Sequence, residues 1–251
     1  MLKIENVETA GLEPAIRGMR NPMNSWDKSD SGLTCPHGEY NMGVERCSQC
    51  VIEKTSCENV PYFAVGPNDL QTMKNLSNGG PVHGKFKRMI KVYMDITAPL
   101  YWWKEFDTYK VGTNCNSCST MHKIHAKEFV LDDFSHEHLL TKEQSEPFNA
   151  LLLSGTSKSI VGVELLHLTI NVLNFYRQRF LESKDKQYWW QMIQLLPTSY
   201  NQRRTVELNY EVLTAMYRDR RNHKLDEWHT LCERVEELPY SELITAKPTY
   251  V

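Results

Sequence analysis

The sequence has neither an excess of one charge nor a long hydrophobic run. Its 251 residues include 29 lysines and arginines and 31 aspartates and glutamates, which gives a formal net charge of −2. This balance excludes the broad positive field of a protein that coats nucleic acid. No stretch approaches the roughly 20 apolar residues that span a bilayer. We therefore expect neither a nucleic-acid polymer nor a membrane as a partner, while small anionic ligands are still allowed.

The start of the sequence lacks the pattern of a secretory signal, and the cysteines cannot all pair with one another. Acidic residues stand within the first eight positions, where a signal peptide would carry its apolar run. The chain has seven cysteines, an odd number, so complete internal disulfide pairing is impossible. Both features favour a reducing compartment with free or metal-bound thiols. We expect the protein to be cytoplasmic.

The apolar pattern predicts an α+β protein. Apolar and polar side chains alternate over residues 90–97, which is typical of a strand with one buried face. Helical spacing predicts a long helix over 160–181. The spacing of Ser199 and Gln202 matches a capping box, which predicts another helix from 199 to about 218. Three shorter helices are expected over 69–76, 188–196 and 225–238.

A polar, cysteine-rich segment at about 27–66 interrupts this pattern and reads as a long irregular loop. Residues 47–50 have the C-x-x-C spacing that fits a tetrahedral zinc ion. Such a metal would order a loop too polar to order itself. Only one such pair is present, so a surface loop with reduced thiols is the alternative. The candidate zinc ligands are Cys35, Cys47, Cys50 and Cys57, with His37 as a further donor.

A second C-x-x-C, from Cys115 to Cys118, lies in a run of small polar residues at 113–120. A redox pair normally begins a helix after a strand in a βαβ unit, and the surrounding order does not show that unit. The hydroxyls and amides suggest a loop that meets a polar ligand or another subunit. An ordinary turn is the alternative.

A mixed stripe lies near the end of the chain. On one helix, Asn209, Leu213, Met216 and Arg220 would fall at i, i+4, i+7 and i+11. A planar guanidinium in such a stripe suits a phosphate or a pyrimidine carbonyl. The alternative is that Arg220 stabilises the carboxyl end of its helix, where cations are favoured.

These residues resemble a known family. Leu196-Pro197, Arg203, Asn209, Leu213, Arg220 and His223-Lys224 are similar in spacing to the C-terminal motif of the flavin-dependent thymidylate synthases. Weaker similarities occur in the right order: residues 15–20 to an arginine-containing segment, His83 to a histidine fifteen residues before Ala98-Pro99, and residues 116–119 to part of the signature loop.

The resemblance implies a single domain of residues 1–251 with an insertion at about 27–66. Its fold would be α+β, with central antiparallel strands and long helices, assembled as a homotetramer whose sites are built from several subunits. It implies that reduced FAD mediates transfer of a one-carbon unit from methylene-tetrahydrofolate to deoxyuridylate, with NADPH as the reductant and no cysteine nucleophile. Carried over by position, Arg203 would bind the nucleotide phosphate, Ser119 would lie near the nucleotide, and Arg220 would contact the pyrimidine as the catalytic residue. The residues expected to bind the flavin are His83, Asn209 and His223.

The sequence departs from the family pattern in its signature loop. The family has Arg-His-Arg where this chain has Asp107-Thr108-Tyr109, so an acid stands where a cation grips phosphate. Ser117 and Met121 replace a glutamate and an arginine, and Arg88 stands where an acid is expected. The alternative function is therefore a non-catalytic tetrameric binding or regulatory protein that retains the fold.

Overall fold

The computed structural model describes residues 2–34, 62–145, 148–151 and 157–246. The chain forms two compact units. The first unit comprises residues 1–5, 95–110 and 115–206, and the second comprises 6–94, 111–114 and 207–251. Four predicted zinc ligands, Cys35, Cys47, Cys50 and Cys57, lie outside the described residues, so the zinc site stays a prediction.

A four-stranded sheet contributes residues to both units. Its strand order is β1 (Lys3–Ala10), β4 (Lys91–Pro99), β8 (Asn201–Asn209) and β5 (Asn114–Ser117). The predicted strand over 90–97 is confirmed as β4, whose apolar side chains Val92, Met94 and Ile96 are buried. Among the described residues, two further antiparallel pairs form, one of β2 (Gly32–Thr34) with β3 (Tyr62–Ala64) and one of β6 (Phe148–Leu151) with β7 (Ser157–Ile160). The α+β class with antiparallel strands and long helices is as predicted.

The predicted helix from 199 to 218 is wrong in its first half, because residues 201–209 form strand β8. Within β8, Val206 and Leu208 are fully buried while Arg203 and Thr205 face outward, which is the period of two of a half-buried strand. The cap that begins the helix is Asn209, whose side-chain oxygen accepts a hydrogen bond from the Val212 amide at 2.9 Å. Helix α8 therefore begins at Tyr210 and ends at Arg220.

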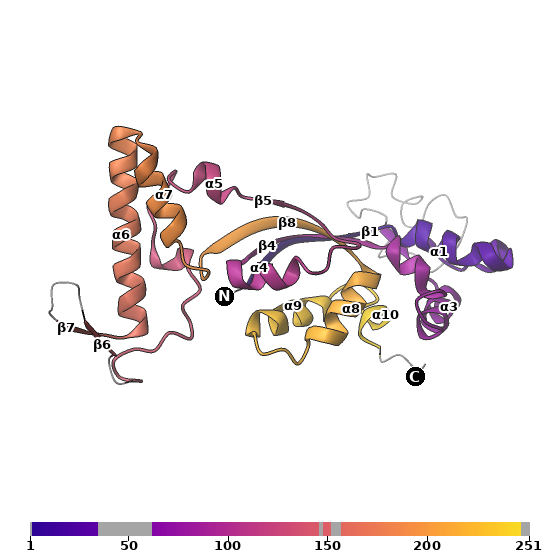
Figure 1. Cartoon of the computed structure of the whole chain (residues 1–251). Helices are drawn as coiled ribbons and strands as arrows, with labels where there is room; N and C mark the ends of the chain where they lie inside the picture. Colours follow the sequence, from indigo (N-terminus) through magenta and orange to yellow (C-terminus); the bar gives the residue numbers. More distant parts are fainter. Residues whose placement is uncertain (1, 35–61, 146–147, 152–156, 247–251) are drawn as a thin grey trace, which may run out of the picture. The chain divides into compact units, whose positions relative to one another are not determined.

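The first unit is built around a helical pair. Helix α6 (Gly162–Ser183) confirms the predicted long helix and lies beside α7 (Lys186–Leu195), as Figure 1 shows. Leu166, Leu173 and Met192 from these helices are buried with aromatic residues of the preceding segment. The unit also contains α4 (Leu100–Phe106), α5 (Thr120–Lys123), a 3₁₀ turn at Leu131–Asp133, β6 (Phe148–Leu151) and β7 (Ser157–Ile160).

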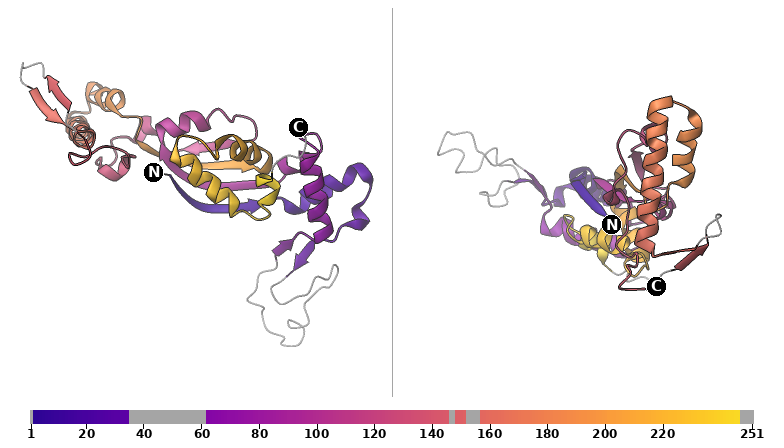
Figure 2. Two further views of the ribbon diagram at one scale, coloured as in Figure 1. Left: turned by 90° about the horizontal axis from the view of Figure 1, so that it is seen from below. Right: turned by 90° about the vertical axis from the view of Figure 1, so that its left-hand side faces the viewer.

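The second unit gathers the remaining helices. Its amino-terminal part contains α1 (Leu12–Arg20), 3₁₀ turns at Asn21–Met23, Trp26–Lys28 and Gly84–Arg88, β2 (Gly32–Thr34), β3 (Tyr62–Ala64) and α3 (Pro67–Asn78). Its carboxyl-terminal helices α8, α9 (Asp226–Glu236) and α10 (Glu242–Thr245) cluster together (Figure 2). Among the described residues, no helix combines the length and apolar character required to cross a membrane.

A buried ion pair fixes α1 to α3 inside the second unit. Arg20 donates to Asp69 from both Nε and Nη2, at 2.8 and 2.7 Å. The other carboxylate oxygen accepts hydrogen bonds from the hydroxyls of Ser29 and Ser31, each at 2.6 Å. Burial alone would raise the pKa of Asp69, but these two serines and Arg20 outweigh it and lower the pKa.

We predict that Asp69→Asn lowers the free energy of unfolding by about 3–5 kcal/mol at pH 7, because it leaves the Arg20 charge buried without a counter-charge. A carboxyl whose pKa is lowered on folding stabilises the protein above its unfolded pKa, near 4, and this contribution is lost as the pH falls through the folded pKa. The difference between wild type and variant should therefore shrink below about pH 4.

Urea denaturation at several pH values measures this difference. Asp27→Asn is the matched control, because Asp27 is exposed on the turn at Trp26–Lys28. A change below about 0.5 kcal/mol for Asp69→Asn at pH 7, equal to that of the control, would show that the buried pair is not stabilising.

Candidate functional site

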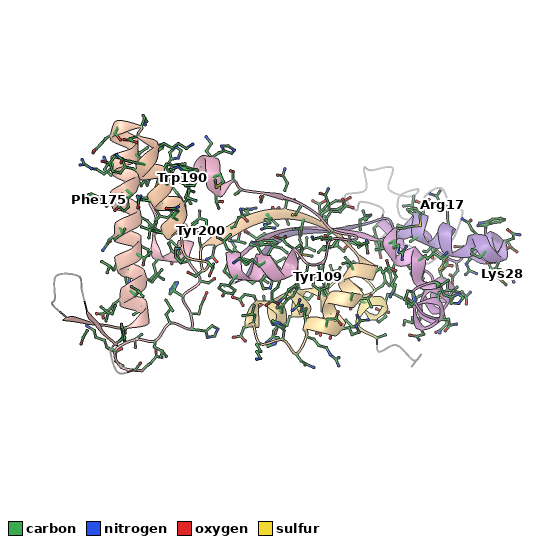
Figure 3. The ribbon with its side chains drawn as sticks, viewed as in Figure 1. Arg17, Lys28, Tyr109, Phe175, Trp190 and Tyr200 are labelled. Atoms are coloured by element: carbon green, nitrogen blue, oxygen red, sulfur yellow. The ribbon has the colours of Figure 1, made fainter. Side chains whose placement is uncertain are left out.

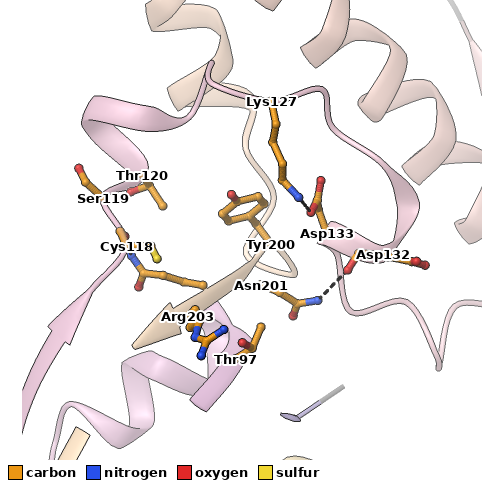
Figure 4. Close-up of a pocket in the computed structure, with 11 residues that line it drawn as sticks. Thr97, Cys118, Ser119, Thr120, Lys127, Asp132, Asp133, Tyr200, Asn201 and Arg203 are labelled. Carbon is orange, nitrogen blue, oxygen red and sulfur yellow. Dashed lines mark hydrogen bonds and ion pairs between the residues drawn. The ribbon is translucent and has the colours of Figure 1, made fainter. Parts of the chain in front are cut away.

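A pocket of about 280 Å³ opens in the first unit (Figure 4). Four segments line it: the end of β4 at Thr97, the turn at residues 118–120, the segment that carries Lys127, Asp132 and Asp133, and residues 200–203 at the start of β8. Ser119 and Arg203, both predicted to bind substrate, thus lie in one pocket. Within the first unit, we take this pocket as the candidate site.

Two hydrogen bonds of the Cys118 backbone, with Gln202 and Arg203, hold residues 118 and 119 against β8. The Cys118 amide donates to the Arg203 carbonyl at 3.0 Å, and the buried Gln202 amide donates to the Cys118 carbonyl at 2.8 Å. The Ser119 hydroxyl accepts from the His122 amide at 3.0 Å and so caps the short helix α5. These bonds explain how positions far apart in the sequence line one wall.

The opposite wall is held by an aromatic cluster. The Tyr200 ring packs edge-on against Phe134, with 5.6 Å between the ring centroids. In Figure 4 this ring lies between the 118–120 side of the pocket and the side that carries Asp133. Burial, together with the negative charge of the nearby Asp133, raises the pKa of Tyr200. The phenol therefore stays protonated near neutral pH and offers a hydrogen-bond donor.

The two cations of the pocket already have carboxylate partners. Arg203 Nη2 donates to Asp95 Oδ2 at 2.8 Å, and Arg203 Nη1 lies 3.8 Å from Glu5. Lys127 pairs with Asp133. The hydrogen bond and the charge of Asp95 raise the pKa of Arg203, so the guanidinium is firmly positive and firmly held. Sequence reasoning missed Asp95, although its position on the exposed face of a predicted strand was a usable signal.

The acid of the altered signature also has a partner within the first unit. Asp107 accepts from Arg204 Nη1 at 2.7 Å, and the Arg204 guanidinium lies over the Trp103 ring, 4.2 Å from its centroid. Arg204 Nε also donates to Gln202 at 3.0 Å. Asp107 and Arg204 therefore fasten the segment after α4 to β8.

The two cysteines of the second C-x-x-C do not form a disulfide. Cys115 lies in strand β5 and Cys118 directly follows it, and both thiols are free and exposed. Three residues of extended chain span about 10 Å between α-carbons, whereas a disulfide needs less than about 7 Å. Cys118 lines the pocket beside Ser119.

The other four predicted site residues lie in the second unit. The Arg220 guanidinium lies over the Trp228 ring at 4.8 Å, and the His223 ring contacts the same tryptophan with 6.4 Å between centroids. Asn209 is buried, and its amide nitrogen donates to the Gly112 carbonyl at 3.4 Å. His83 is exposed just before the turn at Gly84–Arg88.

The described residues meet the requirements of a flavin only in part. His83 is an exposed ring, whereas His223 is half-buried and its Nδ1 accepts from the Leu225 amide at 3.2 Å. Both polar atoms of the Asn209 side chain are bonded within the chain, one as the cap of α8. At residues 107–109 a paired carboxylate stands where a diphosphate needs cations, so this element does not fit the flavin diphosphate. In the described part of the chain, no group of three or more His, Cys, Asp or Glu side chains could hold a metal ion.

Comparison with solved structures identifies the fold. The chain is similar to thymidylate synthase X (ThyX) from Helicobacter pylori, crystallised with FAD and dUMP, with a TM-score of 0.58 and 13% identity over 98% of this chain and 97% of that chain. It is also similar to the UMP/dUMP methylase PolB from Streptomyces cacaoi, bound with 5-Br dUMP, with a TM-score of 0.56 and 14% identity over 99% and 96% of the two chains.

The chain has the fold of the flavin-dependent thymidylate synthases. The resemblance expected from the C-terminal motif is thus confirmed as a shared fold that covers nearly the whole chain. No protein-family model and no curated protein matches the sequence. In this thymidylate synthase fold, the candidate pocket is the place where Ser119 and Arg203 come together.

We predict that Gln202→Leu loosens the pocket wall. The variant keeps the side-chain volume but removes the donor to the Cys118 carbonyl and the acceptor for Arg204, which should cost about 1–2 kcal/mol of unfolding free energy. Hydrogen exchange at the Cys118 amide should become faster. Gln194→Leu on the exposed face of α7 is the control. Unchanged stability and unchanged exchange in Gln202→Leu would show that this bond does not hold residues 118–120.

Proposed function

We propose that this chain is an enzyme that modifies a pyrimidine nucleotide in a flavin-dependent reaction. The default reaction is transfer of a one-carbon unit from methylene-tetrahydrofolate to deoxyuridylate, with FAD as the cofactor and NADPH as the reductant. One observation carries the proposal: Ser119 and Arg203 line one pocket with Tyr200, in a chain whose fold matches proteins crystallised with FAD and dUMP.

The pocket residues have chemistry that suits a pyrimidine nucleotide. Tyr200 offers an aromatic ring and a protonated hydroxyl, while Ser119 and Arg203 are the proposed substrate-binding groups of the first unit. Arg220 is proposed to contact the pyrimidine, since a guanidinium suits carbonyl oxygens. His83, Asn209 and His223 are the proposed flavin-lining residues. A bound flavin would supply the redox and one-carbon chemistry, whereas the protein binds and orients.

We also propose a homotetramer of cytoplasmic subunits. An apolar stripe on α6 supports an assembly: by their spacing Leu165, Leu168 and Phe175 share one helix face, and they are 46–57% exposed. Figure 3 labels Phe175 on this helix. Leucines and phenylalanines in such a row are typical of a face that another subunit covers. Light scattering on the full chain gives the subunit number, and a monomer would contradict the proposal.

The second candidate is a non-catalytic tetrameric protein that retains the fold. The observation that favours it is Asp107, which is paired with Arg204. This acid stands at the position of the signature loop where the family has a cation. Such a protein would use the same pocket for binding or regulation. The zinc proposal for the cysteine-rich segment is compatible with either function.

We predict that the purified full chain binds FAD and shows a flavin absorption spectrum. It should then release tritium from deoxyuridylate labelled at the pyrimidine carbon that is alkylated, in the presence of methylene-tetrahydrofolate and NADPH. A colourless protein that ignores added FAD would contradict the enzyme and favour the second candidate. A flavoprotein that binds deoxyuridylate without tritium release would retain the cofactor and contradict the proposed reaction.

A further inference from the structure

The charged groups in and beside the pocket of the first unit carry more negative than positive charge. The lining holds two cations, Lys127 and Arg203, and the Asp133 carboxylate. Asp95 and Glu5, which both contact Arg203, add two further negative charges. The five groups together carry a net charge of −1. A dianionic phosphate placed among them would be repelled by three carboxylates while two cations attract it.

Strand order explains how Arg203 reaches both of its carboxylate partners. β1, β4 and β8 are neighbours in the sheet, so Glu5, Asp95 and Arg203 lie on three successive strands. Asp95 is the inner member of this row, with only 15% of its side chain exposed. Its second oxygen accepts from the hydroxyl of Thr205, two residues further along β8. Asp95 is therefore held from both sides, and it holds the guanidinium in turn.

The neutral groups of the pocket suit the remainder of a nucleoside. Tyr200 presents a ring on which a base can stack, and Thr97, Ser119 and Thr120 present hydroxyls. Hydroxyls both donate and accept, so they match the carbonyl oxygens and ring nitrogens of a pyrimidine and the hydroxyls of a sugar. Most of the binding free energy in this pocket would therefore come from the base and the sugar.

We propose that Asp95, assisted by Glu5, is a specificity-determining residue that makes this pocket accept unphosphorylated pyrimidine nucleosides about as well as their monophosphates. The proposal rests on the proposed function, because it takes the pocket to bind a pyrimidine ligand. It differs from the resemblance in one respect: Arg203 serves first as the counter-charge of Asp95 and Glu5, and contributes little net attraction to a phosphate.

The test compares deoxyuridine with deoxyuridylate by isothermal titration on the full chain, with and without FAD. In wild type the two Kd values should agree within about threefold. Asp95→Asn keeps the shape and an acceptor for Thr205 but removes one charge next to Arg203, so it should tighten deoxyuridylate binding by about tenfold and leave deoxyuridine unchanged. Glu5→Gln should act in the same direction and more weakly, because Glu5 is farther from the guanidinium.

Glu8→Gln is the matched control, since Glu8 is an exposed carboxylate on the same strand as Glu5. Deoxyuridylate binding at least 100-fold tighter than deoxyuridine in wild type would overturn this inference and leave the proposed function intact. An unchanged ratio of the two Kd values in both Asp95→Asn and Glu5→Gln would overturn it too. Failure of wild type and variants to bind either ligand would contradict the proposed function itself.

Discussion

The ion pair between Arg203 on β8 and Asp95 on β4 sets the electrostatics of the candidate pocket. It joins neighbouring strands of the central sheet. The charges of the same two residues act on any ligand in the pocket, which Arg203 lines. The hydrogen bonds that bring residues 118–120 to the pocket come from the same stretch of β8, at Gln202 and the Arg203 carbonyl. The start of β8 therefore holds residues 118–120 in place and also lines the pocket.

Charge rearrangement around the altered signature follows the same logic. Asp107 accepts a hydrogen bond from Arg204, whose guanidinium also stacks on Trp103. Two adjacent arginines on β8 thus serve two different carboxylates, Asp95 and Asp107. In the first unit, both guanidinium groups therefore pair with carboxylates of the same chain. The shared fold does not by itself set how strongly the pocket attracts a phosphate.

The sequence predicted much of this fold because its strongest signals are periodic. Both β4 and α6 bury one face, and the spacing of their apolar residues along the sequence indicates which face that is. The error at 199–218 arose where a polar strand carried a chance capping box and the true cap, Asn209, stood ten residues later. Ser119 and Arg203 were predicted from the resemblance to the family, and the pocket brings them together. The ion pairs of Arg203 could not be foreseen, because they depend on which strands are neighbours.

We propose that a pyrimidine ligand occupies the pocket between residues 118–120 and Tyr200. Two free, exposed cysteines test it directly, because Cys118 lines this pocket and Cys115, three residues earlier, does not. Alkylation of each thiol by iodoacetamide can be followed by peptide mass spectrometry with and without deoxyuridine. At ten times the Kd, the ligand should slow alkylation of Cys118 about tenfold by occupancy alone and leave Cys115 unchanged. Equal rates at Cys118 with and without bound deoxyuridine would contradict the account.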